Sequence, residues 1–332
     1  MTQAITAAIA QVVRGEALEG ALMEAAMEAI LRGEATPAQI AALAVGLRMR
    51  GETAEELAAA ARVMRRHAAP LALRADRLLD TCGTGGDGAG TFNISTVAAI
   101  VVAACGVRVA KHGNRAVSSS CGSADVLEAL GLPLDRDPAA SLDAHGIAFL
   151  FAPAFHGALK HAAPVRRELG LRTFFNLLGP LANPAGASHQ LLGVYDEARV
   201  TPIAEVLLAL GVTGAWVVHG AGGLDEVSPS GPTRVAVLEG GRVEERVIEP
   251  RDFGLEPVPL EALSGGGPSA NASIARAVLG GERGAPRTAV VINAAAALVA
   301  SGEIADLREA AERTAAAIDG GAAALLLARW IG

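Results

Sequence analysis

A glycine-rich run, Asp-Thr-Cys-Gly-Thr-Gly-Gly-Asp-Gly, occupies residues 80–88 and is followed by Asn-Ile-Ser-Thr at 93–96. Apolar Leu78 and Leu79 precede it and are expected to end a short strand, and an apolar helix is expected to begin near 94. Four glycines in the run let backbone N–H groups approach an anion without obstruction by Cβ atoms, and the helix N-terminus adds positive charge. The sequence therefore predicts a phosphate cradle here.

This loop matches neither of the two common nucleotide-binding patterns. No Gly-Lys-Ser/Thr closes it, and the acidic residue that a dinucleotide fold places about 20 residues further on, after a second strand, is missing. Asp87 would repel a bare anion. We therefore expect a metal ion or a sugar hydroxyl beside it.

A second polar run, Lys-His-Gly-Asn-Arg-Ala-Val-Ser-Ser-Ser, occupies 111–120 and follows a predicted strand over 107–110. Loops after the strands of open α/β sheets commonly hold ligands. Lys111 is conspicuous because the chain has only one other lysine, Lys160. The run has the cations, amide and hydroxyls to complete a pyrophosphate shell. The alternative is a solvated loop that ends in a helix cap at Ser123.

Two further runs carry charges suited to ligands. Leu224-Asp225-Glu226 follows a glycine-rich turn, and adjacent carboxylates in such a place can hold Mg²⁺ shared with substrate phosphates; the alternative is an acidic turn. Pro-Val-Arg-Arg-Glu-Leu-Gly at 164–170 offers an arginine that could pair with a carboxylate through two hydrogen bonds; the alternative is an exposed basic helix end. The histidines lack zinc spacing, and no Gly-x-Ser-x-Gly motif is present.

The elements that must position these runs divide the chain in two. The first 67 residues predict about four short helices, with capping boxes at 36–39 and 53–56, and residues 68–71 break the helical pattern. From Leu78 onward, apolar runs alternate with helices, which predicts a mainly parallel sheet covered by helices. The expected strands are 107–110, 147–151, 190–194 and 216–218, with a hairpin over 234–238 and 243–248; the expected helices are 94–105, 123–130, 200–210 and 288–300.

Segment 156–186 departs from this alternation. A helix over 156–169 is interrupted by Pro164, and 179–184 predicts an irregular loop. We expect the segment to return and pack on the N-terminal helices.

Composition limits the functional classes. The 332 residues allow about two domains. Because 51% of residues are hydrophobic and only 3% aromatic, the core must consist mainly of Ala, Leu and Val, which suits packed helices. A net charge of −7 without a basic block argues against nucleic acid as partner. Three unpaired cysteines, no signal peptide and no apolar run near 20 residues favour a soluble cytoplasmic protein without a membrane partner.

Taken together, these runs resemble the anthranilate phosphoribosyltransferase family of tryptophan biosynthesis over most of the chain. The glycine loop is shared with pyrimidine nucleoside phosphorylases, whereas Lys-His-Gly-Asn-Arg and Leu-Gly-Pro-Leu are not. The runs that carry the resemblance, in the family's order, lie at 83–87, 93–96, 111–115, 122–125, 164–166, 172–176, 178–181 and 224–226.

The resemblance implies an α/β fold with a small all-helical domain, a large α/β domain with a mainly parallel central sheet, and an active site in the cleft between them. Residues 1–70 and 156–186 would form the helical domain, and 71–155 with 187–332 the α/β domain. It also implies a cytoplasmic homodimer that joins through the helical domain.

The resemblance further implies an Mg²⁺-dependent glycosyltransferase that needs no catalytic base. Anthranilate would meet Gly83, Asn114 and Arg166, and Mg²⁺ would be held by Ser95, Asp225 and Glu226. Phosphoribosyl pyrophosphate would sit on Gly83, Gly86, Asp87, Thr91, Asn93, Ser95, Thr96, Lys111, Ser119 and Ser123, with His112 beside it in the same substrate-binding loop. Ser120, Cys121 and Ala270 depart from the usual family residues.

Two alternatives stay open at this point. A pyrimidine nucleoside phosphorylase would use phosphate and a nucleoside instead. A non-catalytic relative of the same fold that binds nucleic acid would need a basic face, which the net charge of −7 does not favour.

Overall fold

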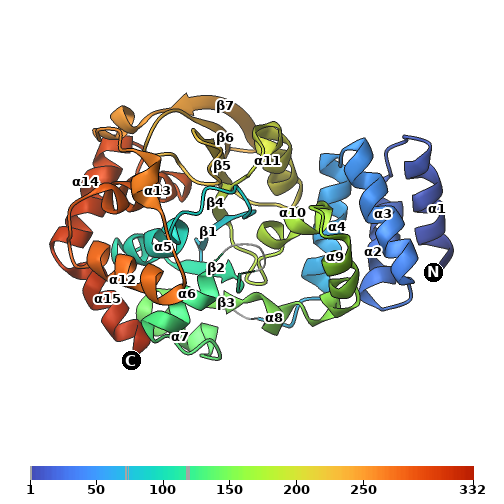
Figure 1. Ribbon diagram of the computed structural model, residues 1–332, viewed down its shortest axis with the longest axis horizontal. Coiled ribbons are helices and arrows are strands. Elements are labelled where there is room, and N and C mark those ends of the chain that lie inside the picture. Colours follow the sequence, from blue (N-terminus) through green and yellow to red (C-terminus); the bar gives the residue numbers. More distant parts are fainter. Residues whose placement is uncertain (1, 72, 74, 117–119) are drawn as a thin grey trace.

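A computed structural model describes residues 2–71, 73, 75–116 and 120–332. Four helices at the N-terminal end form a bundle that lies to one side of a central sheet, and the C-terminal helices lie on the other side (Figure 1). Thr36 and Thr53 form the predicted capping boxes, each accepting a hydrogen bond from the backbone N–H three residues later. The four bundle helices are α1 (Thr2–Val13), α2 (Gly20–Leu31), α3 (Pro37–Arg50) and α4 (Ala54–Arg66).

The sheet has seven strands in the order β3-β2-β1-β4-β5-β6-β7. The first five in this order are parallel, and the last two add an antiparallel hairpin, so the predicted mainly parallel sheet is confirmed. Leu79 begins the first strand instead of ending it, because β4 offers pairing partners from Leu79 through Gly83. The strands are β1 (Leu79–Gly83), β2 (Val109–Gly113), β3 (Ile147–Phe151), β4 (His189–Gly193), β5 (Gly214–Gly220), β6 (Thr233–Glu239) and β7 (Arg242–Ile248).

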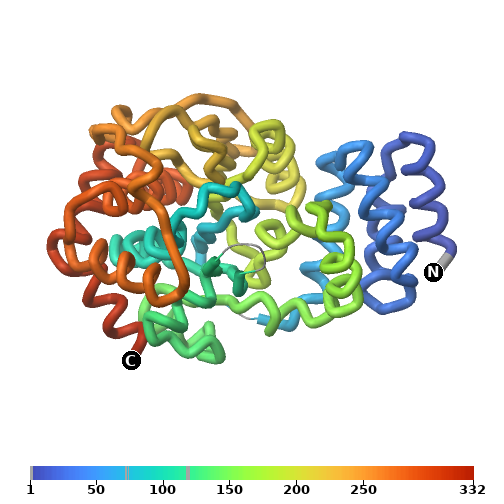
Figure 2. Tube along the Cα trace, in the orientation of Figure 1, coloured from blue at the N-terminus to red at the C-terminus, as the bar shows by residue number. Residues whose placement is uncertain are grey.

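Helices cover both faces of the sheet and divide the apolar core. One core joins α5 and the C-terminal helices to Leu191, Trp216 and Val218. A second core joins α11, α10 (Phe174–Leu181) and the bundle to Leu192 and Val217, so the bundle and the sheet share it, and a smaller third cluster includes Leu78 and Ala110. Figure 2 shows the chain passing between the two parts more than once. The remaining helices of the α/β part are α5 (Ile94–Ala104), α6 (Ser123–Leu130), α7 (Pro138–His145), α11 (Val200–Ala209), α12 (Pro268–Leu279), α13 (Ala285–Ala300), α14 (Leu307–Asp319) and α15 (Ala322–Ile331).

Within the ranges described above, no single helix has both the length and the apolar character needed to cross a bilayer. The bent pair α14 and α15 meets those two criteria only when taken together.

Segment 156–186 packs on the N-terminal helices, as expected. It forms a 3₁₀ turn (Gly157–His161), α9 (Ala163–Leu169) and α10 (Phe174–Leu181), after a short α8 (Ala152–Phe155). Helix α9 contacts α3, and α10 contacts both α3 and α4. The break at Pro164 is confirmed, since this proline lies in the first turn of α9. The irregular loop expected from 179 is wrong as far as Leu181, because α10 includes Gly179 and Pro180 in its last turn.

Candidate active site

The predicted ligand loops meet at one edge of the sheet, where the carboxyl ends of the parallel strands lie. Gly83 and Gly193 are paired in register at the ends of β1 and β4. A Cβ atom on Gly83 would collide with the side chain of Asp225, and one on Gly193 with the Asp225 backbone. Both strands must therefore end in glycine for the loop after β5 to approach this closely.

The carboxylates of Asp225 and Glu226 accept hydrogen bonds from the glycine loop and from the start of α5. The Gly85 N–H donates to Asp225 Oδ2 over 2.7 Å, and the Ser95 N–H donates to Glu226 Oε1 over 3.1 Å. Burial and the nearby Asp87 carboxylate raise the pKa of Asp225 to about 7. Burial and Asp225 together raise the pKa of Glu226 to about 8. Ionising both side chains is costly without a cation, so the pair suits a divalent ion.

The donor set at this point consists of oxygen atoms. Two carboxylates and the Ser95 hydroxyl match the preference of Mg²⁺ for hard ligands. In the part of the chain that the structure describes, no three His, Cys, Asp or Glu side chains cluster as metal ligands. The residues present therefore fit an ion that completes its shell with water and with substrate oxygens.

Lys111, on β2, is buried and has its ammonium beside this set. Its Nζ donates to the Thr81 carbonyl oxygen and, over 3.4 Å, to Ser95 Oγ. Burial lowers the pKa of Lys111, and the Asp80 carboxylate opposes that shift. Among the described residues no carboxylate lies within ion-pair distance of Lys111. Its charge is therefore available to an incoming anion.

The buried side chain of Asp80 cross-links the backbone segments around Lys111. Its carboxylate is fully buried and accepts from the His112 N–H over 3.1 Å and from Asn183 Nδ2 over 2.8 Å. Burial raises the pKa of Asp80 to about 6, against the opposing charge of Lys111. The carboxylate thus ties β1 to β2 and to the segment that follows α10.

The N-terminus of α5 is fixed by two amide side chains. Asn93 Nδ2 donates to the Cys121 carbonyl oxygen over 3.0 Å, and Asn271 Nδ2 donates to Asn93 Oδ1 over 2.9 Å. The Gly266 N–H in turn donates to Asn271 Oδ1 over 2.7 Å. Asn93 therefore uses its side chain to hold neighbouring loops. Asn271 was missed as a site residue, and its only sequence signal was its place after a glycine run.

Other predicted residues lie around this centre. Thr91 forms an isolated bridge with Ser264, Thr96 is buried in α5, and Ser123 begins α6 with its Oγ donating to the Asn114 carbonyl oxygen over 3.3 Å. Asp87 Oδ1 accepts from the Ala89 N–H over 3.1 Å. Ser119 lies outside the described residues.

His112 links the sheet to segment 156–186. Its Nδ1 lies 3.1 Å from the Gly179 carbonyl oxygen, and its ring meets His156 edge-on with centroids 5.1 Å apart. Burial lowers the pKa of His112 to about 3, so the ring is neutral near pH 7. With Nδ1–H donating to Gly179, the buried Nε2 is an acceptor that has no partner among the described residues.

Arg166, on α9, is a half-buried cation. Its guanidinium carbon lies 5.6 Å from the centroid of the Phe175 ring, and burial lowers its pKa. No hydrogen bond or ion pair reaches this guanidinium from any residue that the structure describes. An unpaired arginine in such surroundings suits a ligand carboxylate.

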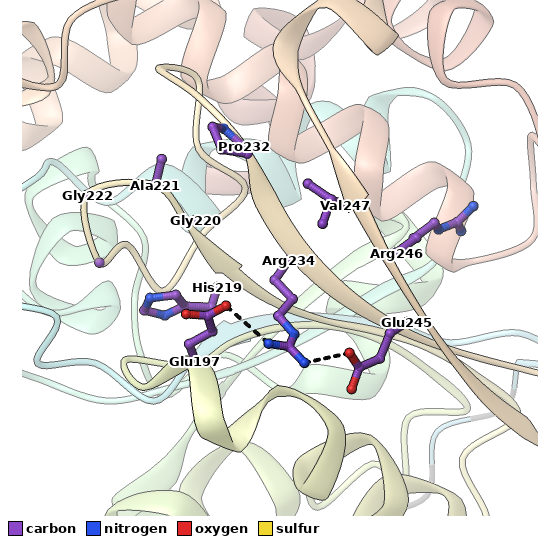
Figure 3. A pocket seen from close by; sticks show the side chains of 11 residues that line it. Glu197, His219, Gly220, Ala221, Gly222, Pro232, Arg234, Glu245, Arg246 and Val247 are labelled. Atoms are coloured by element: carbon purple, nitrogen blue, oxygen red, sulfur yellow. Dashed lines mark hydrogen bonds and ion pairs between the residues drawn. The ribbon is translucent and has the colours of Figure 1, made fainter.

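A separate hollow of about 690 Å³ lies beside the turn that leads to Asp225, between that turn and β6 and β7 (Figure 3). Its central cation, Arg234, donates to Glu197 over 3.2 Å and to Glu245 over 2.6 Å. These charges satisfy one another, and none of the predicted site residues lines the hollow. The hollow is therefore separate from the predicted ligand groups, which lie at the edge of the sheet.

Comparisons with known proteins match both parts of the chain. A family model for the α/β domain of the glycosyl transferase family matches residues 75–324, and a model for that family's helical bundle domain matches residues 6–68. The anthranilate phosphoribosyltransferase of Myxococcus xanthus is 57% identical over 273 residues, which cover 81% of each chain.

Two solved proteins share the whole fold. The crystal structure of anthranilate phosphoribosyltransferase from Thermus thermophilus has a TM-score of 0.92 and 46% identity over 98% of each chain. The Saccharomyces cerevisiae enzyme in complex with PRPP and Mg has a TM-score of 0.89 and 28% identity, over 100% of this chain and 98% of that one. Its complex with 4-fluoroanthranilate scores 0.88 at 28% identity and the same coverage.

Proposed function

This chain belongs to the glycosyl transferase family, among its anthranilate phosphoribosyltransferases, and we propose that the loops after β1, β2 and β5 form its active site. The enzyme transfers the phosphoribosyl group from phosphoribosyl pyrophosphate to the amine of anthranilate, giving N-(5-phosphoribosyl)anthranilate and pyrophosphate in tryptophan biosynthesis. One observation carries the site assignment: the glycine loop, Lys111 and the Asp225-Glu226 pair meet at one sheet edge.

The diphosphate donor binds between the glycine loop and the α5 N-terminus. The N-terminus of α5 presents the positive end of its helix dipole, the glycine loop lets backbone N–H groups approach an anion closely, and Lys111 adds an ammonium group. The yeast relative in complex with PRPP and Mg supports this ligand class. The contacting residues we propose are Gly83, Gly86, Asp87, Thr91, Asn93, Ser95, Thr96, Lys111, His112, Ser119 and Ser123, with Asn93 acting through its backbone because its amide is occupied.

Ser95, Asp225 and Glu226 hold the magnesium ion that this enzyme family uses. Their oxygen atoms fit it, and their raised pKa values show that the pair is poorly compensated when alone. When bound, Mg²⁺ supplies positive charge close to the oxygens of the departing diphosphate.

Anthranilate binds with its carboxylate on Arg166 and with Asn114 and Gly83 beside its ring and amine. In the reaction the bond from the ribose anomeric carbon to a diphosphate oxygen breaks, and the amine nitrogen forms a bond to that carbon. An aromatic amine is neutral at pH 7 and already carries its lone pair, so the chain needs no strong base. Lys111 and the backbone amides neutralise the leaving group, and catalysis rests on positioning and electrostatics.

The larger assembly follows from the same proposal. Residues 1–70 with 156–186 form the helical domain, residues 71–155 with 187–332 form the α/β domain, and the active site lies in the cleft between them. Two copies join through the helical domain, where Val13 and Met49 expose 76% and 83% of their surfaces on α1 and α3. The enzyme works in the cytoplasm.

A fluorescence assay tests the reaction. Loss of anthranilate emission should require phosphoribosyl pyrophosphate and Mg²⁺ together. If anthranilate persists while thymidine or uridine with phosphate releases free base, the chain is a nucleoside phosphorylase instead. If no substrate turns over and DNA retains the protein in a salt-sensitive way, the non-catalytic alternative is correct.

A further inference from the structure

The glycine loop between β1 and α5 is poorly restrained by its own sequence. Gly85, Gly86, Gly88 and Gly90 adopt positive φ angles of 68°, 73°, 76° and 65°. Three of them are exposed, and glycine has more backbone freedom to lose than any other residue. A cradle that binds an anion through N–H groups must hold those groups in fixed directions. Contacts from outside the loop must therefore supply the order.

Arg172 makes such a contact at the middle of the loop. Its guanidinium donates a hydrogen bond to the Gly86 carbonyl oxygen. The same guanidinium lies over the ring of Tyr195, with its central carbon 4.4 Å from the ring centroid. A Cβ atom on Gly86 would collide with Arg172, so glycine is required there for this contact as well as for its positive φ.

Tyr195 joins this contact to the beginning of the loop. Its N–H donates to Thr84 Oγ1 over 3.1 Å, and the Thr84 N–H donates to the Gly193 carbonyl oxygen at the end of β4 over 2.9 Å. The backbone of Tyr195 is therefore hydrogen-bonded to the first residue of the loop, and that residue is hydrogen-bonded in turn to the end of β4.

Arg172 itself has little freedom. Gly170, with φ 60°, ends α9, and Thr173 starts α10 with its N–H donating to Asn176 Oδ1 over 3.1 Å. Only Leu171 and Arg172 lie between these two caps. Since α9 and α10 pack on α3 and α4, the position of Arg172 is set by the helical part of the molecule.

We propose that Arg172 and Tyr195 form a clip that orders the glycine loop for phosphoribosyl pyrophosphate, which makes Arg172 a positioning residue for the proposed reaction. In a trans peptide the C=O and the following N–H point to opposite sides. Holding the Gly86 carbonyl toward Arg172 thus directs the Asp87 N–H away from it. Without the clip this peptide can rotate, because the glycines tolerate either orientation.

Four variants test the clip. Arg172→Met and Tyr195→Leu should each raise the KM for phosphoribosyl pyrophosphate at least about tenfold, the range expected for losing a charge-assisted contact. The anthranilate KM should change less than about threefold. Tyr195→Phe keeps the ring and should resemble the parent enzyme. Arg172→Lys should recover little, because an ammonium cannot lie flat on the ring and donate along its plane.

Arg246→Met is the matched control. Arg246 lies over Trp216 at the same 4.4 Å, but on β7 and away from the glycine loop. The substitution Arg246→Met removes an arginine–aromatic contact of the same kind and should leave the KM for phosphoribosyl pyrophosphate and the KM for anthranilate unchanged.

Amide hydrogen exchange of the free protein gives a readout that needs no turnover. Peptides covering 84–90 should exchange faster in Arg172→Met than in the parent or in Arg246→Met, at an unchanged melting temperature. Unchanged exchange together with an unchanged KM for the diphosphate donor would overturn the clip. Failure of the parent enzyme to consume anthranilate would instead overturn the proposed function, and the exchange experiment would still decide the clip.

Discussion

Charged side chains at the sheet edge differ in whether the protein already compensates them. Asp80 is buried with two hydrogen-bond donors on its carboxylate. Asp225 and Glu226 are crowded together, and their pKa values are raised accordingly. Arg166 and Lys111 have no carboxylate within ion-pair distance among the residues described. Glu226 and Lys111, of opposite charge, both contact Ser95 and stay uncompensated, which is the mark of a ligand site, and Arg166 on α9 is a further uncompensated cation.

Arg166→Met should raise the anthranilate KM by at least about tenfold, because a guanidinium–carboxylate contact is worth more than a neutral hydrogen bond. The KM for phosphoribosyl pyrophosphate should change by less than about threefold. Steady-state kinetics with each substrate varied in turn measures both. An unchanged anthranilate KM would remove Arg166 from the site.

His112 should make the protein less stable in acid. Its folded pKa is about 3, whereas an exposed histidine has a pKa of about 6.5. Between these pH values the unfolded chain binds more protons than the folded protein, so the free energy of unfolding rises with pH. The stability contributed by the neutral ring is lost as pH falls from about 6.5 toward 3. His156, Lys111 and the Gly179 carbonyl face the ring.

The melting temperature of His112→Asn should therefore fall less from pH 7 to pH 5 than that of the parent, even if the variant is less stable at pH 7. Scanning calorimetry at both pH values makes the comparison. Equal losses in the two proteins would show that His112 is not the titrating group.

The strand ends illustrate how elements set the geometry of the site. Gly83 and Gly193 stand side by side at the carboxyl ends of β1 and β4, and together they leave room for Asp225. The loop after β5 can approach this closely because the two strands have no Cβ atoms at their ends. This is a property of the paired elements, and no single residue shows it.

Gly193→Ala should displace the Asp225 backbone and lower Mg²⁺-dependent turnover by about a hundredfold, the scale of a misplacement near 1 Å. Gly157→Ala is the control, since a Cβ there meets no atom within 4 Å. Rates at saturating Mg²⁺ and the Mg²⁺ concentration at half-maximal rate measure the effect. Full activity of Gly193→Ala would contradict the close approach.

Local signals predicted most elements, and contacts between distant segments explain the rest. Capping boxes at Thr36 and Thr53 identified helix starts, and apolar alternation identified the parallel strands and the hairpin. Gly179-Pro180 suggested a loop, but buried Leu178 and Leu181 keep α10 helical to its end. Asp80 and Asn183 lie 103 positions apart, and their hydrogen bond left no pattern in the sequence.

The candidate site was predictable only in part for the same reason. The glycine loop, Lys111 and the acidic pair have distinctive composition and were predicted as ligand groups. Arg172, Tyr195 and Asn271 act on those loops from other elements, through single contacts that depend on the fold. Arg172 lies in the run at 172–176 that carries the family resemblance, but nothing in that run indicates that its side chain reaches the glycine loop, and the sequence around Tyr195 does not distinguish it from an ordinary surface or core residue.

For the whole molecule, the shared core makes the bundle and the sheet one unit. The face of the sheet that carries Leu192 and Val217 is continuous with the bundle core. Arg199, at the start of α11, pairs with the buried Glu52 of the bundle over 2.6 Å. The helical part is therefore held firmly enough to position Arg166 and Arg172 from outside the α/β part.

Met49→Glu should convert the proposed dimer into monomers, because it places a charge on an apolar side chain of the bundle that is 83% exposed. Leu325→Glu, on α15 at the opposite end of the molecule, should not, although Leu325 is 58% exposed. Sedimentation velocity measures the mass of each. A monomeric parent, or a dimer that persists in Met49→Glu, would contradict the proposed interface.

The most direct test is a crystal structure of the protein with phosphoribosyl pyrophosphate and Mg²⁺ bound. We predict diphosphate density against the backbone amides of the glycine loop and the α5 N-terminus, with Lys111 in contact and the metal on Ser95, Asp225 and Glu226. Diphosphate bound elsewhere, with this acidic pair still hydrogen-bonded only to Gly85 and Ser95, would contradict the account.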